Sequence, residues 1–314
     1  MAKVEVLKIG TLPQPTEAAL AGAFAVRDAN EEAGAVRAIA RGTGHAPIGA
    51  ALLGRMPQLE IIANFGVGYD GIDLAAAAAR GIVVTNTPDV LTEEVADTAL
   101  GLILMTVRGL GAAERYLRAG RWASEGAFPL SATLRDRRVG IAGLGRIGLA
   151  LARRLDAMSV PVVYHARHPR ADVPYSYFAD LHAMAVDVDT LVAILPGGEA
   201  TRNAIDAHIL KALGANGVLI NIGRGSTVDE AALIAALKGG TIRAAGLDVF
   251  ANEPQVPAEL MTMDNVVLLP HVGSASVYTR AAMGQLMLDN LTSWFTSGRP
   301  LTPVPETPFP PTRG

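Results

Sequence analysis

The chain contains no cysteine among its 314 residues. Disulfide bonds, thiolate nucleophiles and cysteine-ligated metal sites are therefore excluded. An excess of positive charge is also absent, because the formal net charge is −3 at pH 7 and no run of lysines and arginines occurs. This charge pattern argues against a nucleic-acid partner. The histidines lack the spacing of metal ligands, so no metal site is expected.

Long hydrophobic runs are missing as well. The most apolar helical segment, Val95 to Val107, is too short to span a bilayer and contains Asp97. The N-terminal residues Met1-Ala-Lys-Val-Glu-Val6 carry both charges before any apolar run, so a signal peptide is not expected. These features predict a cytoplasmic protein without a membrane partner.

What the chain has is enough apolar sequence for a large core. Half of its residues are hydrophobic and 18% are charged, and its length predicts two domains. Segments typical of strands and helices alternate, which indicates α/β domains with parallel sheets. A mainly apolar helix begins at Thr92 and is expected to continue to about Ala119, and its apolar surface requires burial. A second α/β unit begins at Val139, with strands expected at 139–142, 160–165, 190–195, 218–222, 244–249 and 266–269.

A glycine-rich motif marks the start of this second unit. The sequence Val139-Gly-Ile-Ala-Gly-Leu-Gly-Arg-Ile-Gly148 is an apolar strand that runs into Gly-x-Gly-x-x-Gly and then into an amphipathic helix. In such a motif Gly143 makes the turn, Gly145 lets a pyrophosphate approach the backbone, and Gly148 lets the helix pack on the strand. The helix start at Arg146 and Ile147 would offer N–H groups to the phosphates. The motif predicts a dinucleotide site; the alternative is a tight structural turn.

The end of the next strand indicates which dinucleotide is bound. NAD-binding units carry an acidic residue about 20 positions beyond the motif, where it binds the ribose hydroxyls. Here Ala166 occupies that place, Arg167 follows it, and no carboxylate occurs before Asp172. Because arginine binds phosphate oxygens in pairs, this favours the 2′-phosphate of NADP(H) over NAD(H), which remains possible. The alternative is a solvated basic loop.

Three polar stretches follow later strands of the same unit. They are Asn221-Ile-Gly-Arg224, Leu247-Asp248-Val-Phe-Ala-Asn-Glu253 and Leu269-Pro-His271-Val-Gly273. Taken singly, Arg224 could be a surface charge, Glu253 a turn carboxylate and His271 a loop histidine. The carboxyl ends of parallel strands meet at one edge of a sheet, however, where ligands bind. An arginine can bind a substrate carboxylate or carbonyl, and a histidine beside a glutamate can deliver a proton to a carbonyl oxygen.

The ordered set of motifs resembles the D-isomer-specific 2-hydroxyacid dehydrogenases over nearly the whole chain. It includes Gly66-Val-Gly-Tyr-Asp-Gly-Ile-Asp73, the helix start from Asp89 to Asp97, the glycine motif and the three strand-end stretches. The sequence is most similar to the NADP-preferring glyoxylate/hydroxypyruvate reductases of that family. The resemblance implies two Rossmann-like or flavodoxin-like domains with parallel sheets and a cleft between them. The substrate-binding domain is expected at 1–98 and 288–314, and the NADP-binding domain at 99–287.

The resemblance also implies roles for particular residues. His271 is expected to be the acid/base, Glu253 its partner, and Arg224 the group that orients the substrate. Val67 and Gly68 are expected to offer backbone N–H groups to the substrate carboxylate. Asp248, with the backbone at Ile222 and Gly273, is expected to hold the nicotinamide carboxamide, and Leu195-Pro196 to pass the cofactor. The cofactor-binding residues are thus expected to be Gly143, Gly145, Arg146, Ile147, Gly148, Ala166, Arg167, Leu195, Pro196, Ile222, Asp248 and Gly273.

The function predicted in this way is NADPH-dependent reduction of a small 2-oxo acid, glyoxylate or hydroxypyruvate, to the D-2-hydroxy acid by a homodimer. A sugar-acid reductase of the 2-ketogluconate type shares the same catalytic set and remains an alternative. A nucleotide-sensing binding protein, like the corepressors of the family, is the alternative from another class. His45 is a weaker candidate for contact with substrate. Trp122 and Trp294 could line the site or a dimer contact, but core packing is the expectation for an aromatic residue on a helix or at its end.

Overall fold

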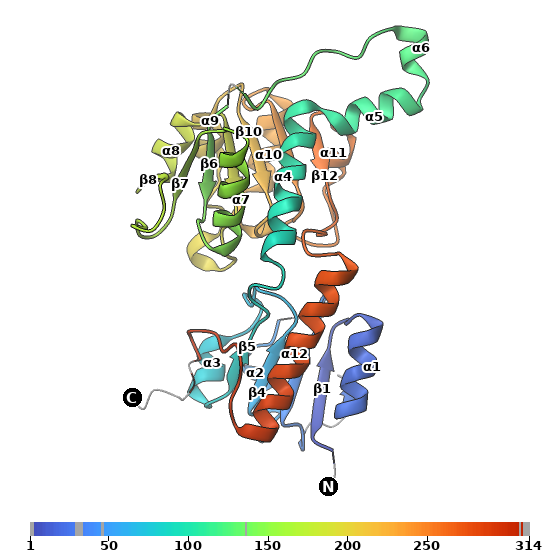
Figure 1. Ribbon diagram of the computed structural model, residues 1–314, viewed down its shortest axis with the longest axis vertical. Helices are drawn as coiled ribbons and strands as arrows, with labels where there is room; N and C mark the ends of the chain where they lie inside the picture. Colours follow the sequence, from blue (N-terminus) through green and yellow to red (C-terminus); the bar gives the residue numbers. More distant parts are fainter. Residues whose placement is uncertain (1–2, 29–33, 45–46, 136, 308, 310–314) are drawn as a thin grey trace. The chain divides into compact units, whose positions relative to one another are not determined.

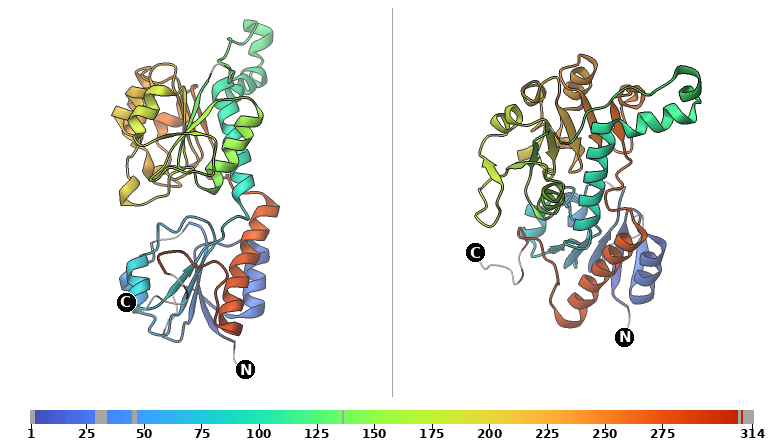
Figure 2. Two further views of the ribbon diagram at one scale, coloured as in Figure 1. Left: turned by 60° about the vertical axis from the view of Figure 1, so that its left-hand side comes forward. Right: turned by 45° about the horizontal axis from the view of Figure 1, so that its top comes forward.

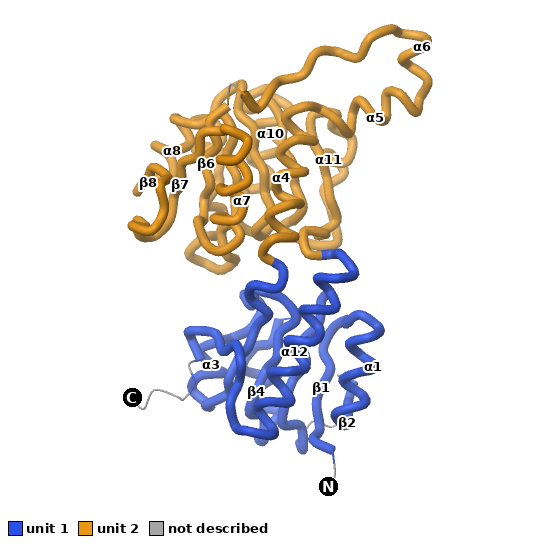
Figure 3. Tube along the Cα trace, in the orientation of Figure 1, with its two compact units in different colours: residues 1–91, 275–314 blue, residues 92–274 orange. Residues whose placement is uncertain are grey.

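The computed structural model describes residues 3–28, 34–44, 47–135, 137–307 and 309. These residues form two compact units, unit 1 from 1–91 and 275–314 and unit 2 from 92–274 (Figure 3). The sequence had placed the boundaries at 98/99 and 287/288, inside two long helices. The units divide instead close to the starts of these helices, at Thr92 and Val277, so each helix belongs to one unit.

Unit 1 is a parallel sheet with helices on both faces. Its elements are β1 (Glu5–Ile9), α1 (Gln14–Ala23), β2 (Ala25–Asp28), β3 (Ala38–Arg41), α2 (Ala50–Gly54), β4 (Ile61–Asn64), α3 (Leu74–Ala79), β5 (Val83–Thr85) and α12 (Val277–Ser297). The strands lie in the order β2-β1-β3-β4-β5, which is the flavodoxin-like order. Helices α1 and α12 cover one face, and α2 and α3 cover the other (Figure 2).

Unit 2 has a sheet of seven parallel strands. Its strands are β6 (Val139–Ala142), β7 (Val162–His165), β8 (Ser176–Phe178), β9 (Thr190–Ala193), β10 (Val218–Asn221), β11 (Ala244–Leu247) and β12 (Val266–Leu268). Its α-helices are α4 (Thr92–Arg108), α5 (Leu110–Arg118), α6 (Arg121–Glu125), α7 (Arg146–Ala157), α8 (Leu181–Asp187), α9 (Ala207–Leu213), α10 (Glu230–Lys238) and α11 (Ala258–Thr262). The strand order β12-β11-β10-β9-β6-β7-β8 reverses between β6 and β9, as in a Rossmann fold. The predicted fold class is therefore confirmed.

The sheet of unit 2 is buried on both faces. Helices α4 and α7 cover one face, and α8, α9 and α10 cover the other (Figures 1 and 2). Every residue of β6, β9, β10 and β11 is buried. Central strands of this kind consist of apolar runs rather than alternating residues, and these runs made them recognisable in the sequence.

The helix expected from Thr92 to about Ala119 is in fact two helices. Helix α4 ends at Arg108, and Gly109 adopts a left-handed conformation with φ of 60° before α5 begins. A glycine takes this conformation without a steric penalty, so the chain can turn sharply there. Among the described residues no single helix is long and apolar enough to cross a membrane; α4 and α5 pass that test only together, bent by 66°.

Two edge strands were not expected from the sequence. β2 pairs with β1 and β8 pairs with β7, each at the edge of its sheet. Neither strand has a buried residue, and β2 ends in Arg27 and Asp28. An edge strand needs no apolar run, so a pattern of hydrophobicity does not reveal it.

Candidate active site

The glycine motif lies where β6 meets α7, at the reversal of strand order in unit 2. Gly143 has φ of 102°, and a Cβ there would lie 2.6 Å from the carbonyl oxygen of Ile194. A Cβ at Gly148 would overlap the carbonyl oxygen of Gly143. The turn and the packing of helix on strand therefore require these two glycines, as the sequence predicts.

Gly145 is different, because the chain itself does not require a glycine at this position. A Cβ on Gly145 would meet no atom within 4 Å, and its φ of −76° suits any residue. Gly145 precedes the 12-residue helix α7 and provides no side-chain cap for it. The first N–H groups of a helix lack acceptors within the helix, so Arg146, Ile147 and Gly148 can offer theirs to an anion. Open space beside these donors fits the pyrophosphate of a dinucleotide.

The end of β7 lies directly beside the glycine motif. The N–H of Gly143 donates to the carbonyl oxygen of His165 at 2.9 Å, so Ala166 and Arg167 follow next to the loop. Arg167 is exposed and makes no hydrogen bond or ion pair with the residues that the structure describes. Arg170, which also follows this strand, donates to the carbonyl oxygen of Leu144 at 2.9 Å. A neutral residue and two guanidinium groups thus border the motif.

The other residues expected at the cofactor also converge. A Cβ on Gly223 would lie 2.8 Å from the carbonyl oxygen of Leu195, so the loop of Leu195 and Pro196 passes close to the end of β10. A Cβ on Gly273 would lie 3.0 Å from Oδ2 of Asp248 and 3.6 Å from Cδ1 of Ile222. Residues from β9, β10, β11 and β12 therefore meet at the carboxyl edge of one sheet.

Asp248 organises the loop that carries His271. Asp248 is 1% exposed, and its carboxylate accepts hydrogen bonds from the N–H groups of Val272 at 2.7 Å and Gly273 at 2.9 Å. Its carbonyl oxygen accepts a hydrogen bond from the N–H of His271 at 2.8 Å. Burial raises the pKa of the Asp248 carboxyl, and the two backbone hydrogen bonds offset only part of this effect. Besides the predicted contact with cofactor, Asp248 therefore has a second role, which is to hold the backbone on both sides of the histidine.

His271 and Glu253 form a close polar pair in the site. His271 Nδ1 lies 2.7 Å from Oε2 of Glu253, and Oε1 of Glu253 accepts the N–H of Phe250 at 3.0 Å. His271 has φ of 53°, a conformation that few residues other than glycine adopt. Its Nε2 has no hydrogen-bond partner among the described residues, and the side chain is 46% exposed. One ring nitrogen is thus fixed by a carboxylate and the other is accessible.

The electrostatic environment keeps Glu253 ionised. Burial would raise the pKa of this carboxyl, but the hydrogen bonds from His271 and Phe250 and the positive charges of His271 and Arg224 outweigh it. The pKa of Glu253 therefore lies below its ordinary value. A carboxylate on Nδ1 fixes the orientation of the imidazole and leaves Nε2 as the nitrogen that can exchange a proton with a ligand.

Arg224 comes from the turn after β10 and lies near this pair. A Cβ on Gly225 would overlap the backbone of Phe250. The backbone after Arg224 therefore lies in close contact with the backbone that leads to Glu253. The carbonyl oxygen of Arg224 accepts hydrogen bonds from Asn221 Nδ2 at 3.0 Å and from Thr227 Oγ1 at 2.7 Å. The backbone of Arg224 is therefore fixed, and its charge acts on Glu253.

The remaining predicted site residues, Val67 and Gly68, belong to unit 1. They follow β4, and both are partly buried. Sequence reasoning missed two polar residues that contact this loop, Asn64 and Asn86. The signal was available, since each is the polar residue that ends or follows a buried strand. His45, a weaker candidate, lies outside the described residues.

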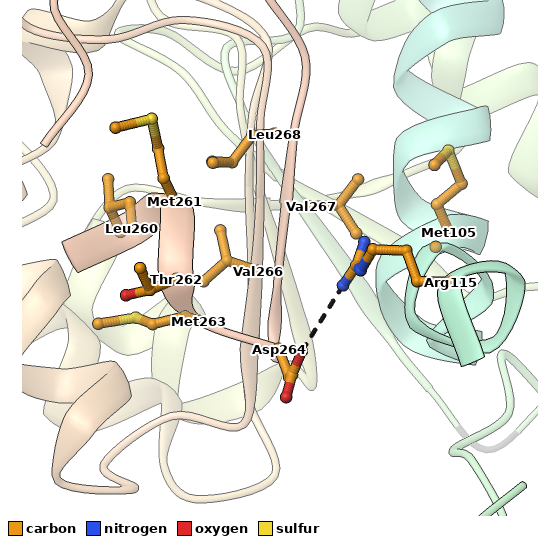
Figure 4. Close-up of a pocket in the computed structure, with 11 residues that line it drawn as sticks. Met105, Arg115, Leu260, Met261, Thr262, Met263, Asp264, Val266, Val267 and Leu268 are labelled. Carbon is orange, nitrogen blue, oxygen red and sulfur yellow. Dashed lines mark ion pairs between the residues drawn. The ribbon is translucent and has the colours of Figure 1, made fainter. Parts of the chain in front are cut away.

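No metal centre and no second site of similar character emerge from the described residues. They include no group of three or more His, Asp or Glu placed to hold a metal ion. A pocket of about 290 Å³ lies between α4 and α5 on one side and α11 and β12 on the other (Figure 4). Its lining includes Met105, Met261 and the ion pair of Arg115 with Asp264, at 3.8 Å, but none of the predicted site residues.

Comparison with known proteins agrees with this arrangement. Residues 100–273 match the NAD binding domain of D-isomer specific 2-hydroxyacid dehydrogenases. A glyoxylate/hydroxypyruvate reductase of Arabidopsis thaliana is 49% identical over 269 residues, which are 86% of this chain and 85% of the relative. A hydroxyphenylpyruvate reductase of Plectranthus scutellarioides is 46% identical over 274 residues, 87% of each chain.

A solved structure is similar over almost the full length. It is the NADPH-dependent glyoxylate/hydroxypyruvate reductase of Sinorhizobium meliloti in complex with NADP and malonate, which has a TM-score of 0.94 and 54% identity and covers 98% of both chains. Together with the glycine motif, the His271–Glu253 pair and the two parallel sheets, these matches show that the chain belongs to the D-isomer specific 2-hydroxyacid dehydrogenase family.

Proposed function

We propose that the protein catalyses the NADPH-dependent reduction of a small 2-oxo acid, with glyoxylate or hydroxypyruvate as substrate, to the D-2-hydroxy acid. The observation that carries this proposal is the His271–Glu253 pair, at 2.7 Å, on the same sheet edge as the glycine motif. An imidazole with one nitrogen on a carboxylate and the other accessible is suited to general acid catalysis. The Arabidopsis thaliana relative and the Sinorhizobium meliloti structure are both named as glyoxylate/hydroxypyruvate reductases, the latter as NADPH-dependent.

Each site residue has a distinct part in the reaction. NADPH, when bound, would supply the hydride that reduces the carbonyl carbon of the substrate. His271 donates a proton from Nε2 to the carbonyl oxygen, and Glu253 fixes the imidazole through Nδ1. Arg224 binds the carboxylate or carbonyl oxygen of the substrate, and the N–H groups of Val67 and Gly68 bind its carboxylate. A substrate held at these groups would present one face of its carbonyl to the hydride donor. Hydroxypyruvate would then give a single stereoisomer, whereas glycolate, the product from glyoxylate, has no stereocentre.

The residues of unit 2 fit NADP(H) better than NAD(H). The open space at Gly145 and the start of α7 suit the pyrophosphate, and Asp248, Ile222 and Gly273 lie together where the nicotinamide carboxamide is expected. Ala166 provides no carboxylate for the ribose hydroxyls, and Arg167 is exposed beside it. An arginine there suits a 2′-phosphate.

The experiment that tests the function is an assay of cofactor oxidation. Glyoxylate, hydroxypyruvate, 2-ketogluconate and hydroxyphenylpyruvate are each offered with NADPH and with NADH. We expect the highest kcat/KM with NADPH and one of the two small acids. A preference for 2-ketogluconate would instead favour the sugar-acid reductase, and nucleotide binding without turnover of any acid would favour the nucleotide-sensing protein.

The role of His271 is tested in the same assay. His271→Ala should lower kcat by about 10²–10⁴-fold, the usual contribution of a general acid, while the affinity for NADPH is retained. His208→Ala is the matched control, because His208 is an exposed imidazole of the same unit outside the site. Unchanged turnover of His271→Ala would contradict the assignment. The homodimer and the cytoplasmic location stay predictions.

A further inference from the structure

The loop after β4 is held at three successive carbonyl groups by asparagine side chains. Asn64 Nδ2 donates to the carbonyl oxygens of Gly66 at 3.0 Å and Gly68 at 3.1 Å. Asn86 Nδ2 donates to the carbonyl oxygen of Val67, which lies between them, at 2.9 Å. No carbonyl in the run from Gly66 to Gly68 is therefore free to rotate.

Holding these carbonyls also sets the direction of the N–H groups that follow them. A peptide unit is planar and trans, so the C=O of one residue and the N–H of the next point in opposite directions. The bonds to the carbonyl of Gly66 fix the N–H of Val67, and the bond to the carbonyl of Val67 fixes the N–H of Gly68. These are the two N–H groups proposed to bind the substrate carboxylate.

The orientation of the Asn64 side chain is set by Arg41. The guanidinium of Arg41 donates from Nη1 to Oδ1 of Asn64 at 2.7 Å, and both side chains are buried. Because arginine has no acceptor, Oδ1 must face it, and Nδ2 must then face the loop carbonyls. A Cβ on Gly71 would overlap the Arg41 guanidinium, so Arg41 packs against the far end of the same loop.

The N–H groups of Val67 and Gly68 have no acceptor among the residues that the structure describes. Both residues are only partly buried. Two N–H groups that are held in position and carry no hydrogen bond to the described residues can receive the oxygens of a carboxylate without reorganisation of the loop.

We propose that Asn64 and Asn86 are positioning residues for the substrate carboxylate, with Arg41 orienting Asn64. This proposal rests on the proposed function, since it concerns the same 2-oxo acid. The asparagines act through the loop and do not touch the substrate. Their effect is on binding: without them the N–H groups of Val67 and Gly68 lose their fixed direction, and the affinity for the carboxylate falls.

The test compares variants that remove the donors of the two side chains. Asn64→Asp keeps an oxygen for Arg41 but places a second oxygen toward the loop carbonyls, Asn64→Ala removes the donor without adding charge, and Asn86→Ala removes the other donor. We expect each variant to raise the KM for glyoxylate about tenfold, which corresponds to the free energy of about one hydrogen bond. The kcat and the KM for NADPH should change little. Affinity for malonate, measured by calorimetry on NADP-loaded enzyme, should fall by a similar factor.

Leu20→Ala is the control for a general loss of stability. Leu20 is fully buried in α1 of the same unit, and α1 packs against α12 and β2. Thermal unfolding of all variants shows whether they are destabilised to a similar degree. We expect the KM for glyoxylate of Leu20→Ala to equal that of the wild type.

The possible outcomes separate this proposal from the proposed function. Malonate affinity of Asn64→Ala and Asn86→Ala equal to that of the wild type would overturn the proposal, as would an equal rise in KM in Leu20→Ala. A wild-type protein that binds malonate but does not reduce glyoxylate would contradict the function, and the variants would still decide the role of the asparagines. A wild-type protein that binds neither acid would overturn both.

Discussion

At the scale of single residues, the proposed chemistry depends on the carboxylate of Glu253, which makes two different contacts. Glu253 accepts a hydrogen bond from the N–H of Phe250 with one oxygen and contacts Nδ1 of His271 with the other. The backbone thus orients the carboxylate, and its charge lies next to the imidazole. A shift of either loop would remove this geometry. The positive charge of Arg224 acts on the same carboxylate, which links all three proposed catalytic side chains electrostatically.

The lowered pKa of Glu253 makes a prediction about stability and pH. Its pKa in the folded protein lies below the value of about 4.3 in an unfolded chain, so the carboxylate stabilises the fold above that value, and this contribution is lost as pH falls through the folded pKa. Glu253→Gln should lower the free energy of unfolding at pH 7 by about 0.5–1 kcal/mol, given the partial exposure of the pair. Between pH 7 and pH 3 the variant should lose less stability than the wild type, measured by urea unfolding.

Glu230→Gln serves as the control for this prediction. Glu230 also accepts a backbone N–H of the same loop, that of Ala251 at 2.7 Å, but has no contact with His271. We expect its stability to follow the pH dependence of the wild type and its kcat to be unchanged. Parallel curves for Glu253→Gln and the wild type would show that the pair with His271 contributes nothing to the fold.

At the scale of elements, the ends of neighbouring strands decide the cofactor. Strand β7 pairs with β6 in register, with His165 beside Ala142, and the N–H of Gly143 bonds to His165. The residue after β7 must therefore lie next to the glycine motif, whatever its identity. The choice of Ala166 and Arg167 at this place, rather than a carboxylate, is the feature that favours a 2′-phosphate.

Exchanging these two residues should reverse the preference. In Ala166→Asp/Arg167→Ala, a carboxylate can accept the ribose hydroxyls and the phosphate loses its guanidinium, so the ratio of kcat/KM for NADPH to that for NADH should fall at least about tenfold. Arg153→Ala removes an exposed guanidinium from α7 in the same unit and should leave the ratio unchanged. A double variant that still prefers NADPH to the same degree would disprove the role of the β7 end.

At the scale of the whole molecule, an exposed apolar segment supports the proposed homodimer. Helices α5 and α6 extend away from the rest of unit 2 (Figure 1). Leu117 is 57% exposed, Trp122 64% and Leu130 100%, so Trp122 is not in the core as the sequence suggested, whereas Trp294 is partly buried and donates from Nε1 to Glu60 at 2.9 Å. Large apolar side chains gathered on one projecting segment are typical of a protein interface.

Adding charge to this segment should weaken the dimer. We expect the wild type to sediment as a dimer at micromolar concentration, and Leu117→Glu/Trp122→Glu to sediment as a monomer, because burial of a charge at an interface is unfavourable. Val186→Glu is the control, since Val186 is 63% exposed on α8 and lies outside the segment. A wild-type monomer, or a double variant that remains dimeric, would contradict the proposal.

Features that depend on a few consecutive residues could be predicted from the amino-acid sequence alone. The central strands are short apolar runs, the glycine motif has three glycines at fixed spacing, and polar residues follow β10, β11 and β12. Each signal lies within a few residues of the chain, so propensity and spacing suffice to read it. The order of these motifs also identified the family, which the comparisons confirm.

Contacts between residues that are distant in the chain became visible only in the folded structure. Glu253 and His271 lie 18 positions apart, and their pairing follows from the adjacency of β11 and β12 in the sheet. The edge strands β2 and β8 and the contact of Asn86 with Val67 likewise depend on neighbours that hydrophobic periodicity does not record. The order of the strands in each sheet and the close packing of backbone segments produce these contacts, and both arise only when the chain folds.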